Sequence, residues 1–89
     1  MVRRVFYLYI IECIGGSLYT GITTDVERRF KEHLWGKGGN YTSSHTPKRV
    51  VYTEKCGTRS DALKREAEIK TFPRKEKILL IQTGSPVDV

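Results

Sequence analysis

The hydrophobic and polar positions at the start of the chain predict a β-hairpin. Residues 5–13 are rich in aromatic and β-branched side chains, a composition typical of a strand. Residues 14–16, Ile-Gly-Gly, have the composition of a turn. Residues 18–23 then return to a strand-like pattern, so two antiparallel strands are expected to pair.

The length of the turn decides which side chains share a face of this hairpin. Successive side chains of a strand point to opposite faces. A two-residue turn places Tyr9 and Tyr19 on opposite faces. A three-residue turn pairs Tyr9 with Gly21 and places both tyrosines on one face, with free space opposite Tyr9. Tyrosines in strands most often serve packing; the alternative here is a pair of phenols in a functional site.

A helix is predicted directly after the hairpin. Residues 24–27 have the Thr-x-x-Glu pattern of a capping box. Val26, Phe30 and Leu34 follow at intervals of four residues, which places them on one apolar stripe of a helix. The helix is expected to end near Gly36, because glycine is common just past a helix end.

The second half of the chain predicts one more strand and two more helices. Residues 36–49 are expected to form a long loop, and loops of such length are often functional. A third strand is predicted over 50–56. A helix opening on a Thr-x-x-Asp pattern is expected over 58–71, and a short last helix follows a proline over 74–81. Residues 82–89 read as a frayed tail.

These elements define an α+β fold, in the broad sense an α/β protein. The order β-β-α-β-α-α predicts a small three-stranded sheet, with an antiparallel N-terminal hairpin, flanked by three helices. A chain of 89 residues is expected to form one domain over residues 1–89, with its core within residues 5–81.

Two polar residues of the first helix border its apolar stripe. At about 100° per residue, Arg29 and His33 lie beside Val26, whereas Arg28 lies on the far side and is expected to be a solvated charge. A border arginine can lay its stem on the core and keep its head in water. A border histidine can be a semi-buried, hydrogen-bonded imidazole. The alternative is that both residues face a cleft at the edge of the sheet.

The second helix carries a carboxylate on its apolar side. The same geometry places Glu66 within the arc formed by Ala62, Leu63 and Ile69. An unpaired buried carboxylate costs several kcal/mol, so Glu66 needs a cation, a metal or an opening to water. One interpretation is a buried Glu–Arg ion pair without function. The other is a ligand for a divalent metal, because carboxylate oxygen suits Mg²⁺.

Composition narrows the class of partner. Sixteen Lys and Arg face ten Asp and Glu, a net charge of +6 that favours a polyanion such as a nucleic acid if the positive groups converge on a cleft. The longest apolar run, residues 5–11, has seven residues, against roughly 20 for a membrane helix. Cys13 and Cys56 lack the spacing of a metal site. A soluble, cytoplasmic protein with free thiols and no membrane contact is expected.

Together these residues resemble the GIY-YIG nuclease superfamily. Its paired signature is similar to Tyr-Leu-Tyr at 7–9 and Tyr-Thr-Gly at 19–21, followed at the family's spacing by Arg29, His33 and Glu66. The likeness covers roughly residues 5–81 and is particularly close to small standalone bacterial proteins of the superfamily.

The resemblance implies a role for each of these residues in phosphodiester hydrolysis. Glu66 would be the metal ligand, for Mg²⁺ or Mn²⁺, and Arg29 would bind phosphate oxygens. Tyr9 would activate a water, assisted by His33, and Tyr19 would make hydrogen bonds in the same centre. A free phenol has a pKa near 10, so positive charge from Arg29, His33 and the metal is expected to assist Tyr9.

Further residues are expected to contact nucleic acid, DNA more readily than RNA. They are the basic, aromatic and histidine residues of the long loop and the second helix: Lys37, Tyr41, His45, Lys48, Arg49 and Lys70. A protein partner that supplies substrate specificity is also expected.

The sequence departs from the family pattern in two ways. Tyr7 replaces the first glycine of the signature, and no asparagine follows Asn40, although many active members carry one near the end of the domain. Two alternatives to a nuclease therefore stay open. One is a nucleic-acid-binding module with little or no turnover, and the other is a subunit of a repair complex.

Overall fold

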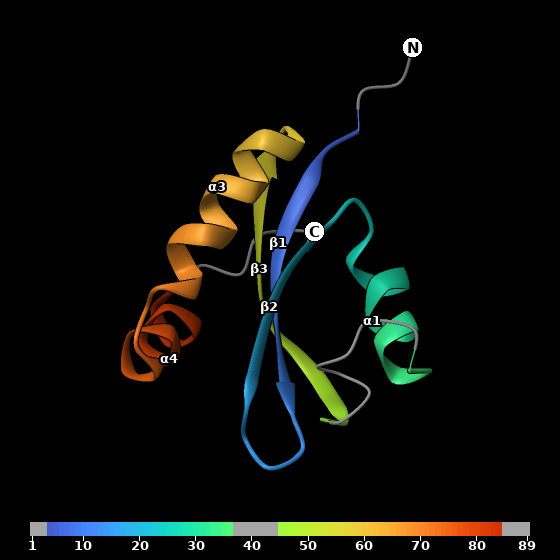
Figure 1. Ribbon diagram of the computed structural model, residues 1–89, viewed down its shortest axis with the longest axis vertical. Coiled ribbons are helices and arrows are strands. Elements are labelled where there is room, and N and C mark those ends of the chain that lie inside the picture. Colours follow the sequence, from blue (N-terminus) through green and yellow to red (C-terminus); the bar gives the residue numbers. More distant parts are fainter. Residues whose placement is uncertain (1–3, 37–44, 85–89) are drawn as a thin grey trace.

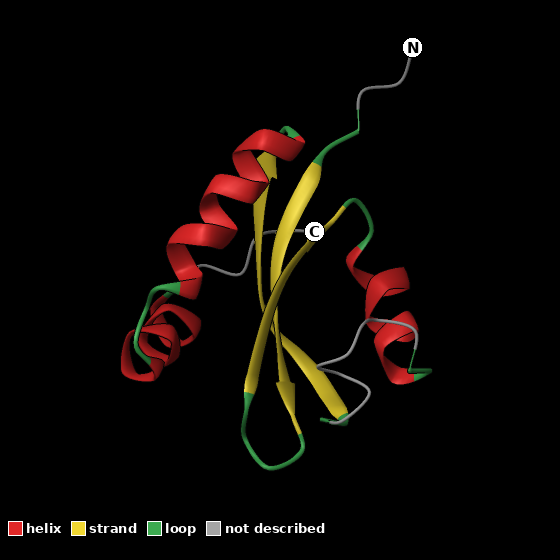
Figure 2. Cartoon of the chain, viewed as in Figure 1, coloured by secondary structure: helices red, strands yellow, loops and turns green. Residues whose placement is uncertain are grey.

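The structure is a computed structural model and describes residues 4–36 and 45–84. The elements, in chain order, are β1 (Phe6–Cys13), β2 (Leu18–Thr23), α1 (Val26–Leu34), β3 (Pro47–Gly57), α3 (Arg59–Lys70) and α4 (Arg74–Thr83). The predicted order and the α+β class are confirmed. Figure 2 shows the three strands and the helices that flank them.

The sheet is antiparallel, with β1 in the centre between β2 and β3. Helix α1 lies on one face of the sheet, and α3 and α4 lie on the other (Figure 1). Since β1 is covered on both sides, its middle residues, from Leu8 to Ile11, are all buried. A central strand covered in this way buries side chains on both of its faces, including that of Tyr9.

The two faces of β1 form two apolar clusters. Leu8 and Ile10 pack with residues of the α3 and α4 side, among them Ile69. Tyr9 and Ile11 pack on the α1 side, with further residues of β2, β3 and α1 around them. The side of the sheet that holds Tyr9 is therefore opposite the side that α3 covers.

The hairpin has the three-residue turn, one of the two turn lengths that the sequence left open. Tyr9 pairs with Gly21 and Ile11 pairs with Tyr19. Gly15 and Gly16 adopt positive φ angles of 97° and 94°, which glycine tolerates because it has no Cβ. Both tyrosines therefore lie on the face of the sheet that α1 covers.

The predicted capping box of α1 is wrong by one residue. Asp25 is the N-cap, and its carboxylate accepts a hydrogen bond of 3.0 Å from the backbone N–H of Arg28. Thr23 accepts a hydrogen bond of 3.1 Å from the backbone N–H of Asp25. The aspartate caps the helix because its charge also complements the positive helix N-terminus.

The buried face of α1 also differs from the prediction. Leu34, expected on the apolar stripe, is 47% exposed, whereas His33 is fully buried. Arg29, Val26 and Phe30 are half-buried. The helix is turned so that the histidine takes the buried place of the leucine, and the reason lies in the hydrogen bond that His33 makes.

Two boundaries in the second half also need correction. Strand β3 begins at Pro47, so the loop is shorter than expected and Lys48 and Arg49 belong to the strand. Proline is tolerated there because it is the first residue of an edge strand. Helix α4 continues to Thr83, past the expected end at residue 81, and the N–H of Gly84 closes it on the carbonyl of Leu80 at 2.6 Å.

None of the helices within residues 4–36 and 45–84 has the length and apolar character needed to cross a membrane.

Replacing Gly21 by alanine tests the close approach of Tyr9. A Cβ on Gly21 would lie 2.5 Å from the phenol oxygen of Tyr9 and 2.7 Å from its Cζ. The backbone of Gly21 does not need a positive φ, so the cost is steric. We expect Gly21→Ala to lower the free energy of unfolding by about 1–3 kcal/mol in urea titrations.

The double variant with Tyr9→Ala is the control. Without the phenol, the three atoms nearest to the new Cβ are removed, so the cost of the alanine at position 21 should shrink. An equal cost of Gly21→Ala in both backgrounds would contradict the steric account.

Candidate active site

The centre of the candidate site is a hydrogen bond between two buried side chains. The phenol oxygen of Tyr9, on β1, lies 2.9 Å from Nε2 of His33, on α1. Tyr9 is 2% exposed and His33 is fully buried. Which of the two atoms donates depends on the tautomer of the imidazole. The bond ties the helix to the central strand and explains why His33 points inward.

Tyr19 completes an aromatic group around His33. Its ring stands edge-on to the imidazole, with ring centres 5.0 Å apart, and its centre lies 6.3 Å from that of Tyr9. The rings of Tyr9 and His33 are 5.9 Å apart. Edge-to-face packing of this kind is favourable, so each ring restricts the rotation of the others.

Gly21 determines where the Tyr9 hydroxyl lies. The phenol crosses the position that a side chain at residue 21 would occupy. Because β2 is an edge strand, this path carries the hydroxyl toward the edge of the sheet. The glycine predicted to leave room opposite Tyr9 does so.

Arg29 adds a positive charge beside this phenol. Its Nη1 donates a hydrogen bond of 2.9 Å to Oε1 of Glu32, one turn further along α1. Arg29 is half-buried, and its guanidinium also interacts with the hydroxyl of Tyr9, which acts to lower the pKa of Tyr9. Glu32, which the sequence analysis missed, holds Arg29 at an i,i+3 spacing that the sequence could have revealed.

Glu66 approaches from the other side of the sheet. Its side chain is 19% exposed, and its carboxylate lies 3.4 Å from Nζ of Lys70. Its negative charge acts to raise the pKa of Tyr9, so the two groups are electrostatically coupled. The cation required by a partly buried carboxylate is therefore Lys70, one turn along the same helix, and not an arginine.

Burial dominates the ionisation of the central pair. Desolvation, and then the neighbouring Tyr19, raise the pKa of Tyr9 to about 12 against the lowering effect of Arg29. Burial, and then the charge of Arg29, lower the pKa of His33. The expectation of a phenol aided by a positively charged histidine is therefore wrong: near neutral pH, Tyr9 is protonated and His33 is uncharged.

Glu66 can serve as a metal ligand, with little help from other side chains. In the described part of the chain, no three His, Cys, Asp or Glu residues gather closely enough to hold an ion. Mg²⁺ is commonly bound through one or two carboxylates, with waters and substrate phosphates as its other ligands. One shielded carboxylate fits this mode, and the donor set does not fit a metal site built from protein ligands alone.

The residues predicted to contact nucleic acid are dispersed. Lys37 and Tyr41 lie outside the described residues. Lys70 contacts Glu66, whereas His45 and Lys48 are exposed around the start of β3.

Arg49 is not part of the cluster around Tyr9. It pairs with Glu12 at 2.9 Å and, with Arg74 of α4, lines a hollow on the opposite face of the sheet.

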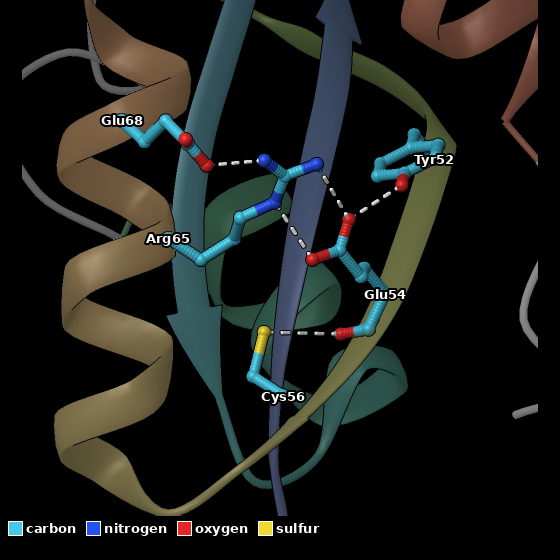
Figure 3. Close-up of polar contacts among 5 residues, drawn as sticks. All are labelled: Tyr52, Glu54, Cys56, Arg65 and Glu68. Atoms are coloured by element: carbon cyan, nitrogen blue, oxygen red, sulfur yellow. Dashed lines mark hydrogen bonds and ion pairs between the residues drawn. The ribbon is translucent and has the colours of Figure 1, made fainter.

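A second polar cluster lies between β3 and α3. The guanidinium of Arg65 binds both carboxylate oxygens of Glu54, and the hydroxyl of Tyr52 donates to one of them (Figure 3). Sequence analysis missed this cluster, although Arg65 borders the apolar side of its helix and Tyr52 and Glu54 share one face of their strand.

The sequence of this chain matches a class of nuclease domains. Residues 5–78 match the GIY-YIG catalytic domain, an endonuclease-type hydrolase domain. The chain belongs to the GIY-YIG family, which confirms the resemblance seen in its sequence.

Relatives within this family are small proteins of similar length. A UPF0213 protein of Haloquadratum walsbyi is 50% identical over 82 residues, which cover 92% of each chain. The solution structure of a UPF0213 protein of Bacillus halodurans is 43% identical, has a TM-score of 0.58, and is matched over 92% of this chain and 88% of its own. The solution structure of a protein of E. faecalis is 40% identical to this chain in sequence and has a TM-score of 0.62. The match covers 91% of this chain and 86% of that protein.

The lowered pKa of His33 makes stability depend on pH. The unfolded chain takes up a proton at the ordinary histidine pKa of about 6.5, whereas the folded chain does so only at lower pH. Below pH 6.5 the unfolded state therefore binds more protons, and the free energy of unfolding falls as the pH falls. We expect urea titrations to show lower stability at pH 5 than at pH 7, and a smaller difference in His33→Gln.

His45→Gln provides the matched control, because the chain has two histidines and His45 is exposed. This variant should keep the pH dependence of the wild type. The account is wrong if His45→Gln reduces the pH dependence and His33→Gln does not.

Proposed function

We propose that this protein is a metal-dependent nuclease that hydrolyses phosphodiester bonds of nucleic acid, with DNA as the favoured substrate. The observation that supports this most strongly is the convergence of Tyr9, His33 and Arg29 from two elements with the charge of Glu66 from a third. Such a group offers a proton relay, a phosphate-binding cation and a metal ligand within one site. Membership of the GIY-YIG family supports the reaction class.

Arg29 binds the phosphate that is to be cleaved. A guanidinium presents N–H donors in a planar fork that matches two phosphate oxygens, a geometry that lysine lacks. One donor of Arg29 is held by Glu32, which fixes the direction of the side chain. The positive charge is then positioned where negative charge develops in the transition state.

Tyr9 and His33 move the proton of the attacking water. A phenol with a pKa of about 12 holds its proton at neutral pH, so Tyr9 can accept a proton only while it passes its own to His33. Neutral His33 can accept it at Nε2, 2.9 Å away, when its Nδ1 carries the hydrogen. Tyr19 packs against the imidazole and keeps it in line with Tyr9.

Glu66 would hold Mg²⁺ or Mn²⁺. A bound ion supplies charge neutralisation at the phosphate oxygens. Binding requires the Glu66 carboxylate to exchange its contact with Lys70 for the ion, and this contact of 3.4 Å is a weak, partly exposed pair. Lys70 would then be available to contact the nucleic-acid backbone.

The substrate is expected to be recognised through its phosphates. A net charge of +6 favours binding that weakens with salt. Lys37, Tyr41, His45, Lys48 and Arg49 remain candidate contacts with nucleic acid. We further propose a cytoplasmic location and a protein partner that adds substrate specificity.

Arg29→Ala should lower the rate of metal-dependent cleavage by about 10²–10³-fold, because it removes a donor to the developing charge. The measurement is the rate of cleavage of supercoiled and branched DNA, and of RNA, with Mg²⁺ or Mn²⁺. Arg28→Ala is the matched control. Arg28 is exposed on the far side of the same helix, and its loss should leave the rate nearly unchanged.

Equal effects of the two substitutions would contradict the assignment of Arg29. Salt-sensitive binding without cleavage of any substrate by the wild type would favour a nucleic-acid-binding module. Stable co-purification with another protein, without affinity for nucleic acid, would favour a subunit of a larger complex.

A further inference from the structure

We propose that the ion pair of Arg65 with Glu54 positions Glu66: it fixes the rotation of α3 about its own axis, and so directs the neighbouring carboxylate toward Tyr9. Arg65 is thus a positioning residue that acts through Glu66. The inference rests on the proposed function, because it concerns the carboxylate that would hold the metal.

The contact between α3 and β3 is a two-point clamp. Nε of Arg65 donates to Oε2 of Glu54 at 2.8 Å, and Nη2 donates to Oε1 at 3.2 Å (Figure 3). The hydroxyl of Tyr52 donates to the same Oε1 at 2.6 Å. Both oxygens of Glu54 are therefore engaged, and a bidentate contact restricts orientation as well as distance.

The surroundings make this pair stronger than a surface ion pair. The side chains of Arg65 and Glu54 are only 29% and 23% exposed. Water screens a partly shielded pair less than an exposed one. Arg65 also contacts Glu68 through Nη1, but Glu68 belongs to the same helix and is 59% exposed, so it does not tie α3 to the sheet.

Apolar packing alone fixes the rotation of α3 poorly. Ala62 and Ile69 are the buried side chains of this helix. At about 100° per residue they lie about 20° apart, on a single narrow line. Alanine offers little apolar surface for packing. Leu63 would extend the buried stripe to one side, but it is 38% exposed. A second contact, away from this line, is therefore needed to fix the rotation of α3 about its own axis.

Arg65 and Glu66 lie on the two sides of that line. Relative to Ala62, Arg65 lies about 60° to one side and Glu66 about 40° to the other. The clamp holds the Arg65 side of α3 on β3. Helix α3 also packs against β2, the strand that carries Gly21. Holding Arg65 on β3 therefore presents Glu66 to the β2 side, where its charge acts on Tyr9.

Loss of the clamp should release Glu66. Lys70, its partner at 3.4 Å, is 53% exposed and can draw the carboxylate outward if the helix turns. Residues that orient a metal ligand typically affect metal affinity by about 10–100-fold when they are changed. Metal affinity is therefore the property on which this inference is tested.

The experiment measures Mn²⁺ binding by electron paramagnetic resonance, with Glu66→Gln as the reference for binding elsewhere on the protein. We expect Arg65→Met, which keeps an unbranched stem, to weaken the Glu66-dependent binding about 10-fold or more. Binding of a short DNA duplex in EDTA should stay within about twofold of the wild type. Circular dichroism melting reports whether each variant is folded.

Further variants separate positioning from folding. Lys64→Met introduces the same side chain on the exposed side of α3 and should leave Mn²⁺ affinity unchanged. Glu68→Gln removes the contact within the helix and should have little effect. If Arg65→Met does not fold, Arg65→Lys retains the charge without the two-point clamp and should still weaken Mn²⁺ binding. The exchanged pair Glu54→Arg with Arg65→Glu should recover part of the affinity.

Each result supports or overturns the inference. Wild-type Mn²⁺ affinity in folded Arg65→Met, alongside weak binding in Glu66→Gln, would disprove positioning by Arg65 and leave the proposed function intact. Equal Mn²⁺ binding by wild type and Glu66→Gln would instead remove Glu66 as the metal ligand, and the proposed function and the inference would fail together.

Discussion

The hydrogen bond between Tyr9 and His33 is the constraint on which the rest of the site depends. It joins the central strand to α1 at 2.9 Å inside the core. A buried polar group needs a partner, and here each of the two groups is the other's partner. Every further feature follows from keeping this bond: Gly21 leaves the path of the phenol open, Tyr19 packs against the imidazole, and α1 turns its leucine outward.

The same burial determines the chemistry that the site can perform. It raises the pKa of Tyr9 and lowers that of His33, so both are uncharged at neutral pH. A phenol of this kind is a poor base alone, but it can pass a proton to a neutral imidazole. In the proposed reaction, the positive charge at the phosphate would therefore come from Arg29 and from the metal that Glu66 would hold. Both side chains are held by partners on their own helices, Glu32 and Lys70.

The parts of the fold that depend on local pattern could be predicted from the sequence. Strand alternation and the turn residues were sufficient for the hairpin and limited its register to two alternatives, one of which brings Gly21 opposite Tyr9, as observed. The capping pattern predicted where α3 begins. The buried faces of the helices were less predictable. A prediction from apolar stripes places leucine in the core in preference to histidine. At position 33 a tertiary hydrogen bond reversed that order.

Long-range polar contacts were beyond the reach of the sequence pattern. The clamp between Arg65 and Glu54 joins residues eleven positions apart on different elements, and neither residue alone signals the other. The sequence analysis expected the assistance that Arg29 gives to the ionisation of Tyr9, but it missed the larger, opposite effect of burial on the pKa of this phenol.

The most direct test of this account is the protonation and tautomer of His33, observed by long-range ¹H–¹⁵N NMR near pH 7. The account predicts an uncharged ring with its hydrogen on Nδ1, and a change in the Nε2 shift when Tyr9 is replaced by phenylalanine. A positively charged ring, or a hydrogen on Nε2, would contradict it, because His33 could not then accept the proton of Tyr9.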